Sequence, residues 1–136
     1  ASLAGGQGVC VPAWMRGRFI SEPQMDIPDA NSAGIEAQLI AYGMATAATD
    51  VMLDLLISHP RIKDLKVTLI DPASTEVVIF NGEKDGEELY LTNFVVKGFP
   101  GDEMANGVWR LQVVDHKSGQ SGILSEFSLT LTSRWD

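Results

Sequence analysis

The stretch of residues 51–80 constrains the fold more than any other part of the chain. Apolar residues recur at every second position in two runs, and a third apolar run follows them: residues 51–57, 65–69 and 77–80. Alternation with a period of two places one set of side chains on one face of a pleated strand. Pro60 and Pro72 separate the runs, and a residue that precedes proline is disfavoured in a helix. The stretch therefore predicts three consecutive strands of an antiparallel sheet.

The first of these runs also has a helical interpretation. Residues 44–57 are built from good helix formers, and Ala48, Met52, Leu55 and Leu56 would form one stripe of a helix. On propensity alone, a helix from Asp50 to Ile57 is open as an alternative, with Thr49 or Asp50 as its N-cap. We expect a strand, because the segments on both sides alternate and a helix would have to end abruptly before Pro60.

Further alternating runs continue along the chain. They cover residues 35–41, 89–96, 108–114 and 124–131, separated by turn sequences at residues 81–86, 98–107 and 115–122. In the last run Leu124 and Phe127 are three positions apart, so a bulge near Ser125 would return both side chains to the core. The pattern predicts an all-β antiparallel fold of about eight strands, at the spacing of a sandwich or barrel.

The composition limits the classes of partner. A chain of 136 residues with 45% hydrophobic residues suits one domain with a substantial core. Its net charge of -8 argues against nucleic acids and anionic membrane surfaces, since both bind clustered Lys and Arg. No apolar run approaches the about 18 residues of a membrane helix, so we expect no membrane insertion. The chain shows no intact signal peptide, which still allows secretion of a processed chain.

Residues 1–19 are expected to form a linker or tail, and residues 20–136 the domain. The first segment is rich in Gly and Ala and has no apolar period. Its Cys10 is the sole cysteine, which excludes an internal disulfide, and we interpret it as a small apolar residue or an unused thiol. Trp14 and Phe19 indicate that the end of this segment packs on another part of the protein.

No motif for catalysis stands out, and we expect no catalytic residue. A Ser–His–Asp triad needs a positioned base beside a nucleophile. His59 lies at a predicted strand end and His116 in a polar turn, while residues 119–122 lack the spacing of a nucleophile elbow. The chain also lacks a phosphate-binding loop and the ligand spacing of a zinc site, so no cofactor-binding residue is assigned.

Calcium is the ligand that the sequence permits best. Asn81, Glu83 and Asp85 precede Gly86 in an oxygen-rich loop, but Thr92 stands where an EF-hand has its closing Glu. Two further carboxylate pairs lie on predicted loops: Asp26 with Asp29, and Asp102 with Glu103. The alternative for each site is a set of solvated turn residues. We assign no metal ligand, and we expect any effect of calcium on the isolated domain to be small.

Several short motifs occur in a recognisable order. They are residues 27–29 (Ile-Pro-Asp), 57–59 (Ile-Ser-His), 64–69, 71–72 (Asp-Pro), 93–94 (Asn-Phe), 107–113 (Gly-Val-Trp-Arg-Leu-Gln-Val), Asp115, 122–124 and 127–131. In this order the chain resembles, over residues 20–133, the P domain or Homo B domain. That module follows the subtilisin-like catalytic domain in kexin, furin and many bacterial secreted proteases. Residues 71–75 depart from the family's Ser-Pro-x-Gly-Thr turn, and Phe127 stands in place of a tryptophan.

The resemblance implies a jelly-roll β-sandwich without catalytic residues of its own. It also implies a secreted protein in which the domain packs in cis on a subtilisin-like serine protease domain and supports its folding and stability. We expect the isolated domain to be a monomer. Within such a fold, Asp64 is expected to accept backbone N–H groups and hold the strands in register, and Trp109 to fill the core.

A second class of function remains open, that of a free-standing jelly roll that binds a carbohydrate or a cell surface. A glycan platform presents exposed aromatic residues on one face, whereas Trp109 fits a core position. Trp14 and Trp135 lie near the ends of the sequence and suit an interface with a neighbouring domain better.

Overall fold

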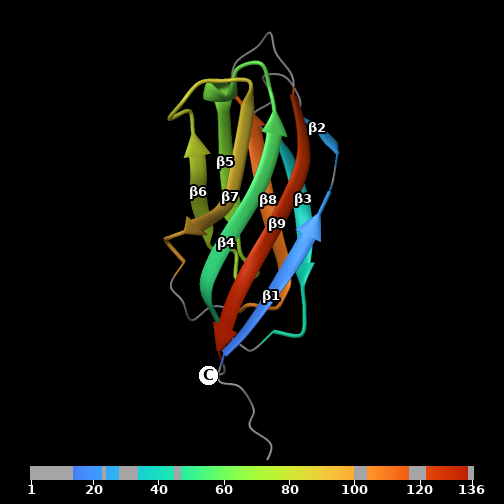
Figure 1. Ribbon diagram of the computed structural model, residues 1–136, viewed down its shortest axis with the longest axis vertical. Helices are drawn as coiled ribbons and strands as arrows, with labels where there is room; N and C mark the ends of the chain where they lie inside the picture. Colours follow the sequence, from blue (N-terminus) through green and yellow to red (C-terminus); the bar gives the residue numbers. More distant parts are fainter. Residues whose placement is uncertain are drawn as a thin grey trace, which may run out of the picture.

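The chain forms a sandwich of two antiparallel sheets, with one 3-10 turn at one end (Figure 1). The computed structural model describes residues 14–22, 24–27, 34–44, 47–99, 104–116 and 122–134. The five-stranded sheet contains β1 (Trp14–Ser21), β2 (Met25–Ile27), β4 (Ala47–Ser58), β7 (Glu88–Val96) and β9 (Gly122–Arg134). The four-stranded sheet contains β3 (Ile35–Ala41), β5 (Leu65–Ile70), β6 (Glu76–Asn81) and β8 (Gly107–Asp115). The 3-10 turn, η1 (Ile62–Asp64), precedes β5.

The strand order identifies the sandwich as a jelly roll. One sheet runs β1-β9-β4-β7 and the other β3-β8-β5-β6, so neighbours in space are mostly distant in sequence. β2 also pairs with β9. It lies on the same edge of β9 as β1, next to residues 122–124, whereas β1 lies next to residues 127–134. The seven alternating runs of the sequence correspond to β3–β9, and the described chain reaches nine strands, where the sequence predicted about eight, by adding β1 and β2. The predicted fold class is confirmed.

The ambiguous segment before Pro60 is a strand, so the helical alternative is wrong. β4 lies in the middle of its sheet, between β7 and β9. Leu53, Leu55 and Ile57 point into the core and are fully or almost fully buried. A helix would have left β7 without its partner and β9 unpaired on one side, and this pairing outweighs the good helix propensity of the segment.

The predicted bulge in the last strand is also confirmed. Leu56 of β4 lies opposite Glu126, whereas the next residue, Ile57, lies opposite Leu124. Ser125 is therefore the extra residue in β9. Leu124 and Phe127 are both completely buried as a result.

The boundary predicted between linker and domain is too late in the chain. β1 begins at Trp14 and pairs with β9 along its whole length, so residues 14–19 belong to the sheet. Gly17, which made this segment resemble a linker, has a packing reason: a Cβ at this position would lie 2.8 Å from Met44 Sδ. Residues 1–13 lie outside the described part, where the assignment as a linker stays a prediction.

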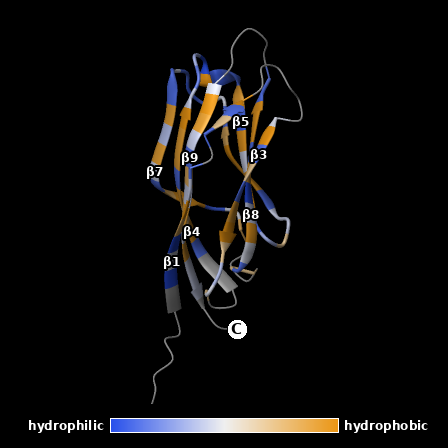
Figure 2. Cartoon of the chain, turned by 90° about the vertical axis from the view of Figure 1, so that its right-hand side faces the viewer, coloured by the Kyte–Doolittle hydropathy of each residue, from blue (hydrophilic) through white to orange (hydrophobic). Residues whose placement is uncertain are grey.

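The core lies between the two sheets. Hydrophobic and hydrophilic residues alternate along several strands (Figure 2), and buried hydrophobic residues of both sheets form one cluster. Trp109 is 1% exposed, stacks edge-on against Phe99, and donates its Nε1–H to Ala105 O at 3.0 Å. Its predicted place in the core is confirmed, and its indole N–H is satisfied as a buried polar group requires.

Candidate functional site

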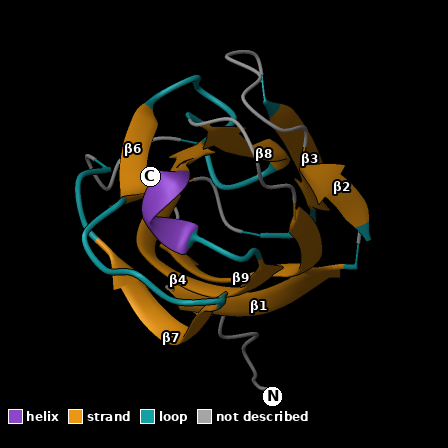
Figure 3. Ribbon diagram, turned by 90° about the horizontal axis from the view of Figure 1, so that it is seen from above, coloured by secondary structure: helices purple, strands orange, loops and turns teal. Residues whose placement is uncertain are grey.

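The best-formed pocket among the described residues lies at the end of the sandwich where β4 ends and β7 and β9 begin. It has a volume of about 310 Å³ and is lined by Ser58, His59, Pro60, Glu87, Gly122 and Ile123. Figure 3 shows the sandwich from this end, with η1 drawn as the helix. The His59 backbone N–H donates to Glu87 O at 3.1 Å, which ties the end of β4 to the start of β7.

The pocket also depends on a glycine at the start of β9. A Cβ on Gly122 would clash with the backbone carbonyl oxygen of Ser58 and would lie 2.9 Å from atoms of the His59 side chain. Any larger residue would therefore force β9 away from the end of β4. The close approach of the two strands explains why this position in the predicted turn carries glycine.

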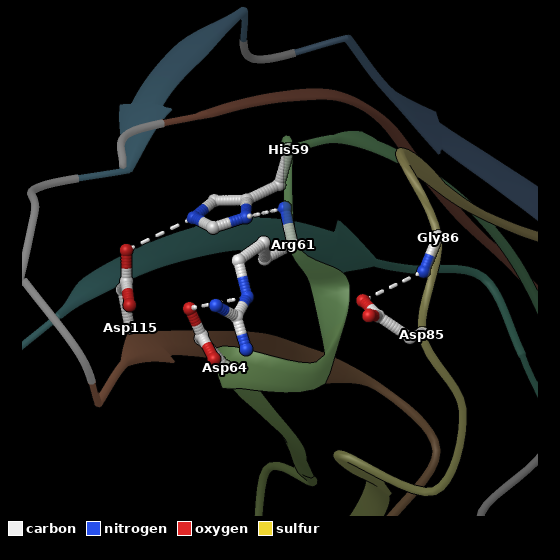
Figure 4. A network of polar contacts seen from close by, with 6 residues as sticks. All are labelled: His59, Arg61, Asp64, Asp85, Gly86 and Asp115. Atoms are coloured by element: carbon white, nitrogen blue, oxygen red, sulfur yellow. Dashed lines mark hydrogen bonds and ion pairs between the residues drawn. The ribbon is translucent and has the colours of Figure 1, made fainter. Parts of the chain in front are cut away.

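A buried histidine–aspartate pair lies next to the pocket (Figure 4). His59 Nε2 is 2.9 Å from Asp115 Oδ2, and both side chains are completely buried. The other ring nitrogen, Nδ1, accepts the backbone N–H of Arg61 at 2.9 Å. Nδ1 therefore carries no proton in this arrangement. Nε2 carries the ring proton and donates a hydrogen bond to Asp115.

The arrangement of this pair is unlike that of a catalytic triad. In a triad, one ring nitrogen contacts the carboxylate and the other faces the nucleophile. Here the second nitrogen of His59 is already occupied by the Arg61 backbone, although Ser58 is its neighbour in sequence and is exposed. His116 is exposed at the end of β8, where its backbone N–H donates to Asp64 O. Both ring nitrogens of His59 are therefore occupied within the described residues.

Asp64 has a different role from the one predicted. Its backbone carbonyl, and not its carboxylate, connects the strands by accepting His116 N–H at 2.8 Å. The carboxylate Oδ2 lies 3.7 Å from Arg61 Nε, while Oδ1 is buried without a hydrogen-bond partner in the structure. The prediction that this carboxylate accepts backbone N–H groups is wrong for Oδ1, because η1 turns those donors elsewhere.

In the oxygen-rich loop that the sequence suggested for calcium, the carboxylates accept hydrogen bonds from backbone N–H groups of the same loop. Both Glu83 oxygens accept Asn81 N–H, at 2.9 and 2.8 Å, and Asp85 Oδ1 accepts Gly86 N–H at 2.8 Å. Asp26 is exposed on β2. No group of three or more His, Cys, Asp or Glu residues in the described part of the chain is arranged to hold a metal ion.

Asp54 is an organising residue that sequence reasoning missed. It lies almost buried in the outer face of the five-stranded sheet, at the middle of β4. Oδ1 accepts Asn93 N–H at 2.7 Å, and Oδ2 lies 3.3 Å from both Ser128 Oγ and Arg18 Nη2. Asn93 belongs to an irregularity in β7 and has a positive φ of 50°. One carboxylate thus connects β4 with the three other main strands of this sheet.

Some predicted positions lie outside the described residues. These are Cys10, Asp29, Asp102, Glu103, Gly119 and Trp135, together with the side chain of Trp14. Within the described ranges, no helix is long and apolar enough to cross a membrane.

The fold defines a class of protein, a jelly-roll β-sandwich module. A sequence model of the family described as "Proprotein convertase P-domain" matches residues 48–131, more than half of the chain. The chain therefore belongs to the proprotein convertase P-domain family, and the predicted resemblance is confirmed.

Curated relatives are proteins that are much longer than this chain. Leupeptin-inactivating enzyme 1 of Streptomyces exfoliatus is 25% identical over 126 residues, which cover 92% of this chain and 28% of that protein. The transglutaminase-activating metalloprotease of Streptomyces mobaraensis is 26% identical over 117 residues, covering 82% of this chain and 14% of that protein. The chain thus spans less than a third of either relative.

Solved structures share the fold at low sequence identity. The serine protease of Aeromonas sobria matches with a TM-score of 0.71 and 15% identity, over 96% of this chain and 29% of the protease chain. FlhE matches with a TM-score of 0.60 and 14% identity, over 90% of this chain and 99% of the FlhE chain. The same jelly roll therefore forms part of a protease chain in one case and almost a whole chain in the other.

Proposed function

We propose that the chain is the non-catalytic P domain of a secreted, subtilisin- or kexin-like serine protease and that it supports the folding and stability of the catalytic domain in cis. The observation that carries the proposal is the match of residues 48–131 to the P-domain family. The fold likeness adds support, because it covers nearly all of this chain but less than a third of the Aeromonas sobria protease.

An accessory domain stabilises its neighbour by binding the folded state and not the unfolded one. The present chain suits this role because a rigid domain offers a fixed surface to its neighbour. Its buried polar groups, such as Asp54 and the His59–Asp115 pair, hold the strands together. Interfaces between domains of one chain bury about 600–1,500 Å² and are fairly polar, which fits a surface with a net charge of -8.

The class of the parent protease is part of the proposal. A serine protease is favoured by the Aeromonas sobria structure, and that protein is named a serine protease. One curated relative is named a metalloprotease, so a metal-dependent parent is the alternative. A serine-directed inhibitor and a metal chelator, applied separately to the parent protein, separate the two classes.

A free-standing binding module is the second candidate, and the match to almost the full length of FlhE favours it. The two most exposed aromatic residues of the described part, Tyr42 and Tyr90, are not placed to form one glycan platform. Tyr42 follows the end of β3 and contacts Phe19, whereas Tyr90 lies near the beginning of β7, at the opposite end of the sandwich (Figure 1). The two rings therefore belong to different surfaces.

The size of the native polypeptide tests the proposal. An antibody to this domain would be used to blot the culture supernatant and the cell extract of the source, and the intact mass of the band would be measured. We expect a secreted band far larger than 14.7 kDa, with protease activity that a serine-directed inhibitor abolishes. A secreted or cellular band near 14.7 kDa, with no linked protease, would refute the accessory role and favour the free-standing module.

A further inference from the structure

The outer face of the five-stranded sheet carries a second feature beside the pocket. Ser58 lies opposite Ile123 on one side and Glu88 on the other, and Ile123 lies opposite Asp26. Directly opposite residues share a face of the sheet, so these four side chains form one row across β2, β9, β4 and β7. The row ends in a carboxylate on both sides.

The next row on the same face continues this pattern. Leu56 lies opposite Glu126 on one side and Tyr90 on the other. Tyr90 is 59% exposed and Ile123 is 42% exposed, and they lie on β7 and β9, on either side of Leu56 and Ser58 in β4. The two rows and the adjoining pocket thus form one surface, in which exposed apolar residues lie among carboxylates.

We call this the acid-rimmed surface and define it by three apolar and four acidic residues: Leu56, Tyr90, Ile123, Asp26, Glu87, Glu88 and Glu126. Glu87 also lines the pocket, and the lining includes no Lys or Arg; its one histidine, His59, is turned to Asp115. Carboxylates therefore outnumber cations around a hollow with partly apolar walls, where Arg61, next to Pro60, is half exposed. Apolar centres with charged rims are typical of protein–protein contacts.

We propose that the acid-rimmed surface binds a protein segment in which a lysine or arginine enters the pocket beside an apolar residue. The volume of about 310 Å³ is at the small end of the range for ligand pockets, about 300–1,000 Å³, and suits one long side chain. The aliphatic stem of such a side chain contacts Ile123 and Pro60, and its charged end lies near Glu87. Tyr90 offers its ring to a neighbouring apolar or cationic group.

The charge of the surface favours this occupant over two others. A second copy of this chain would bring another net charge of -8 to the contact, and like charges disfavour association. A metal ion needs converging oxygen ligands, and the described residues include no group of three or more that could hold one. The proposal does not depend on the role beside a protease, since it follows from the surface alone.

A titration followed by nuclear magnetic resonance tests the proposal on the ¹⁵N-labelled 136-residue chain. The test peptide is acetyl-Gly-Leu-Arg-Val-Gly-amide, and the matched peptide carries citrulline, which has the same shape without charge, in place of arginine. We expect saturable shifts at the backbone amides of Ser58, Glu87 and Ile123. We expect the citrulline peptide to bind about two- to fivefold more weakly, as for the loss of one exposed ion pair.

Two matched variants locate the interaction. Glu87→Gln is expected to weaken binding of the arginine peptide by about two- to fivefold, and to reduce the advantage over the citrulline peptide by the same factor. Glu76→Gln removes another exposed charge, from β6 on the other sheet, and is expected to leave binding unchanged. Both side chains are exposed, so the spectra of the variants are expected to retain the fold of the parent chain.

Four results would overturn the proposal. The first is an absence of saturable shifts, and the second is shifts that centre on the four-stranded sheet. The third is equal weakening by the two variants, which would indicate attraction by net charge alone. The fourth is the same shifts with calcium chloride alone, or on concentrating the free chain, which would assign the surface to a metal ion or to self-association.

Discussion

The two ends of β5 each carry a buried aspartate, and the two residues behave in opposite ways. Asp71, after the strand, accepts two backbone N–H groups with Oδ1, from Ala73 at 3.0 Å and Thr75 at 2.8 Å. Asp64, before the strand, has one oxygen that is buried without a partner, and its other oxygen is 3.7 Å from Arg61. Both are almost completely buried.

The difference shows which turn finds its hydrogen-bond partners nearby in the sequence and which turn depends on residues from distant strands. The turn after β5 satisfies its carboxylate from residues within four positions along the chain. The turn before β5 is instead held by β4 and β8, through His59, Asp115 and the backbone of His116. This turn also lies beside the pocket. The buried carboxylate oxygen without a hydrogen-bond partner is therefore at the same end of the sandwich as the proposed binding surface.

The largest effect on stability is expected for the residue that anchors the turn before β5. His59→Ala removes one partner of the buried Asp115 carboxylate and the acceptor of the Arg61 N–H. Breaking a buried pair by removing one partner costs about 3–5 kcal/mol. Urea unfolding followed by tryptophan fluorescence measures the loss. His116→Ala is the matched control and is expected to change stability by less than about 0.5 kcal/mol, because that side chain is exposed.

A large effect is also expected at the locally complete turn. Asp71→Ala leaves the N–H groups of Ala73 and Thr75 without their carboxylate acceptor, and we expect a loss of about 2–4 kcal/mol in the same unfolding measurement. A loss below about 1 kcal/mol would show that water replaces the carboxylate, and that the turn does not depend on its own side chain.

The smallest effect is expected at the unpaired carboxylate. Asp64→Ala removes a buried oxygen that has no partner, together with one long contact to an Arg61 side chain that is 50% exposed. The change in unfolding free energy is therefore expected to stay within about 1 kcal/mol, with either sign. A loss as large as that of Asp71→Ala would remove the contrast between the two turns.

The period of apolar residues predicted much of the fold. The alternation predicted that β4 is a strand in spite of its helix-forming residues. The spacing of Leu124 and Phe127 predicted the bulge at Ser125. The alternation missed the start of β1, because Gly17 and the neighbouring arginines conceal an edge strand whose partner, β9, is more than a hundred residues away. Pairing at such a distance leaves no local signal in the sequence.

The polar sites were less predictable than the core. Asp64 and Asp71 look alike in sequence, since each borders the same alternating run, and only the direction of the backbone N–H groups decides which carboxylate is satisfied. Asp54 was missed because its partner is the backbone of Asn93, which is available only where β7 departs from regular pairing. Trp109 was predicted correctly because burial follows directly from the alternation.

The central claim is that this domain stabilises a protease in cis, and deletion from the parent protein tests it most directly. The parent would be produced with and without residues 14–134, and the yield of active protease and its half-life of thermal inactivation would be measured for both forms. The account predicts that the shortened form gives little active protease and that its half-life is markedly shorter. Equal yield and equal half-life in the two forms would contradict it.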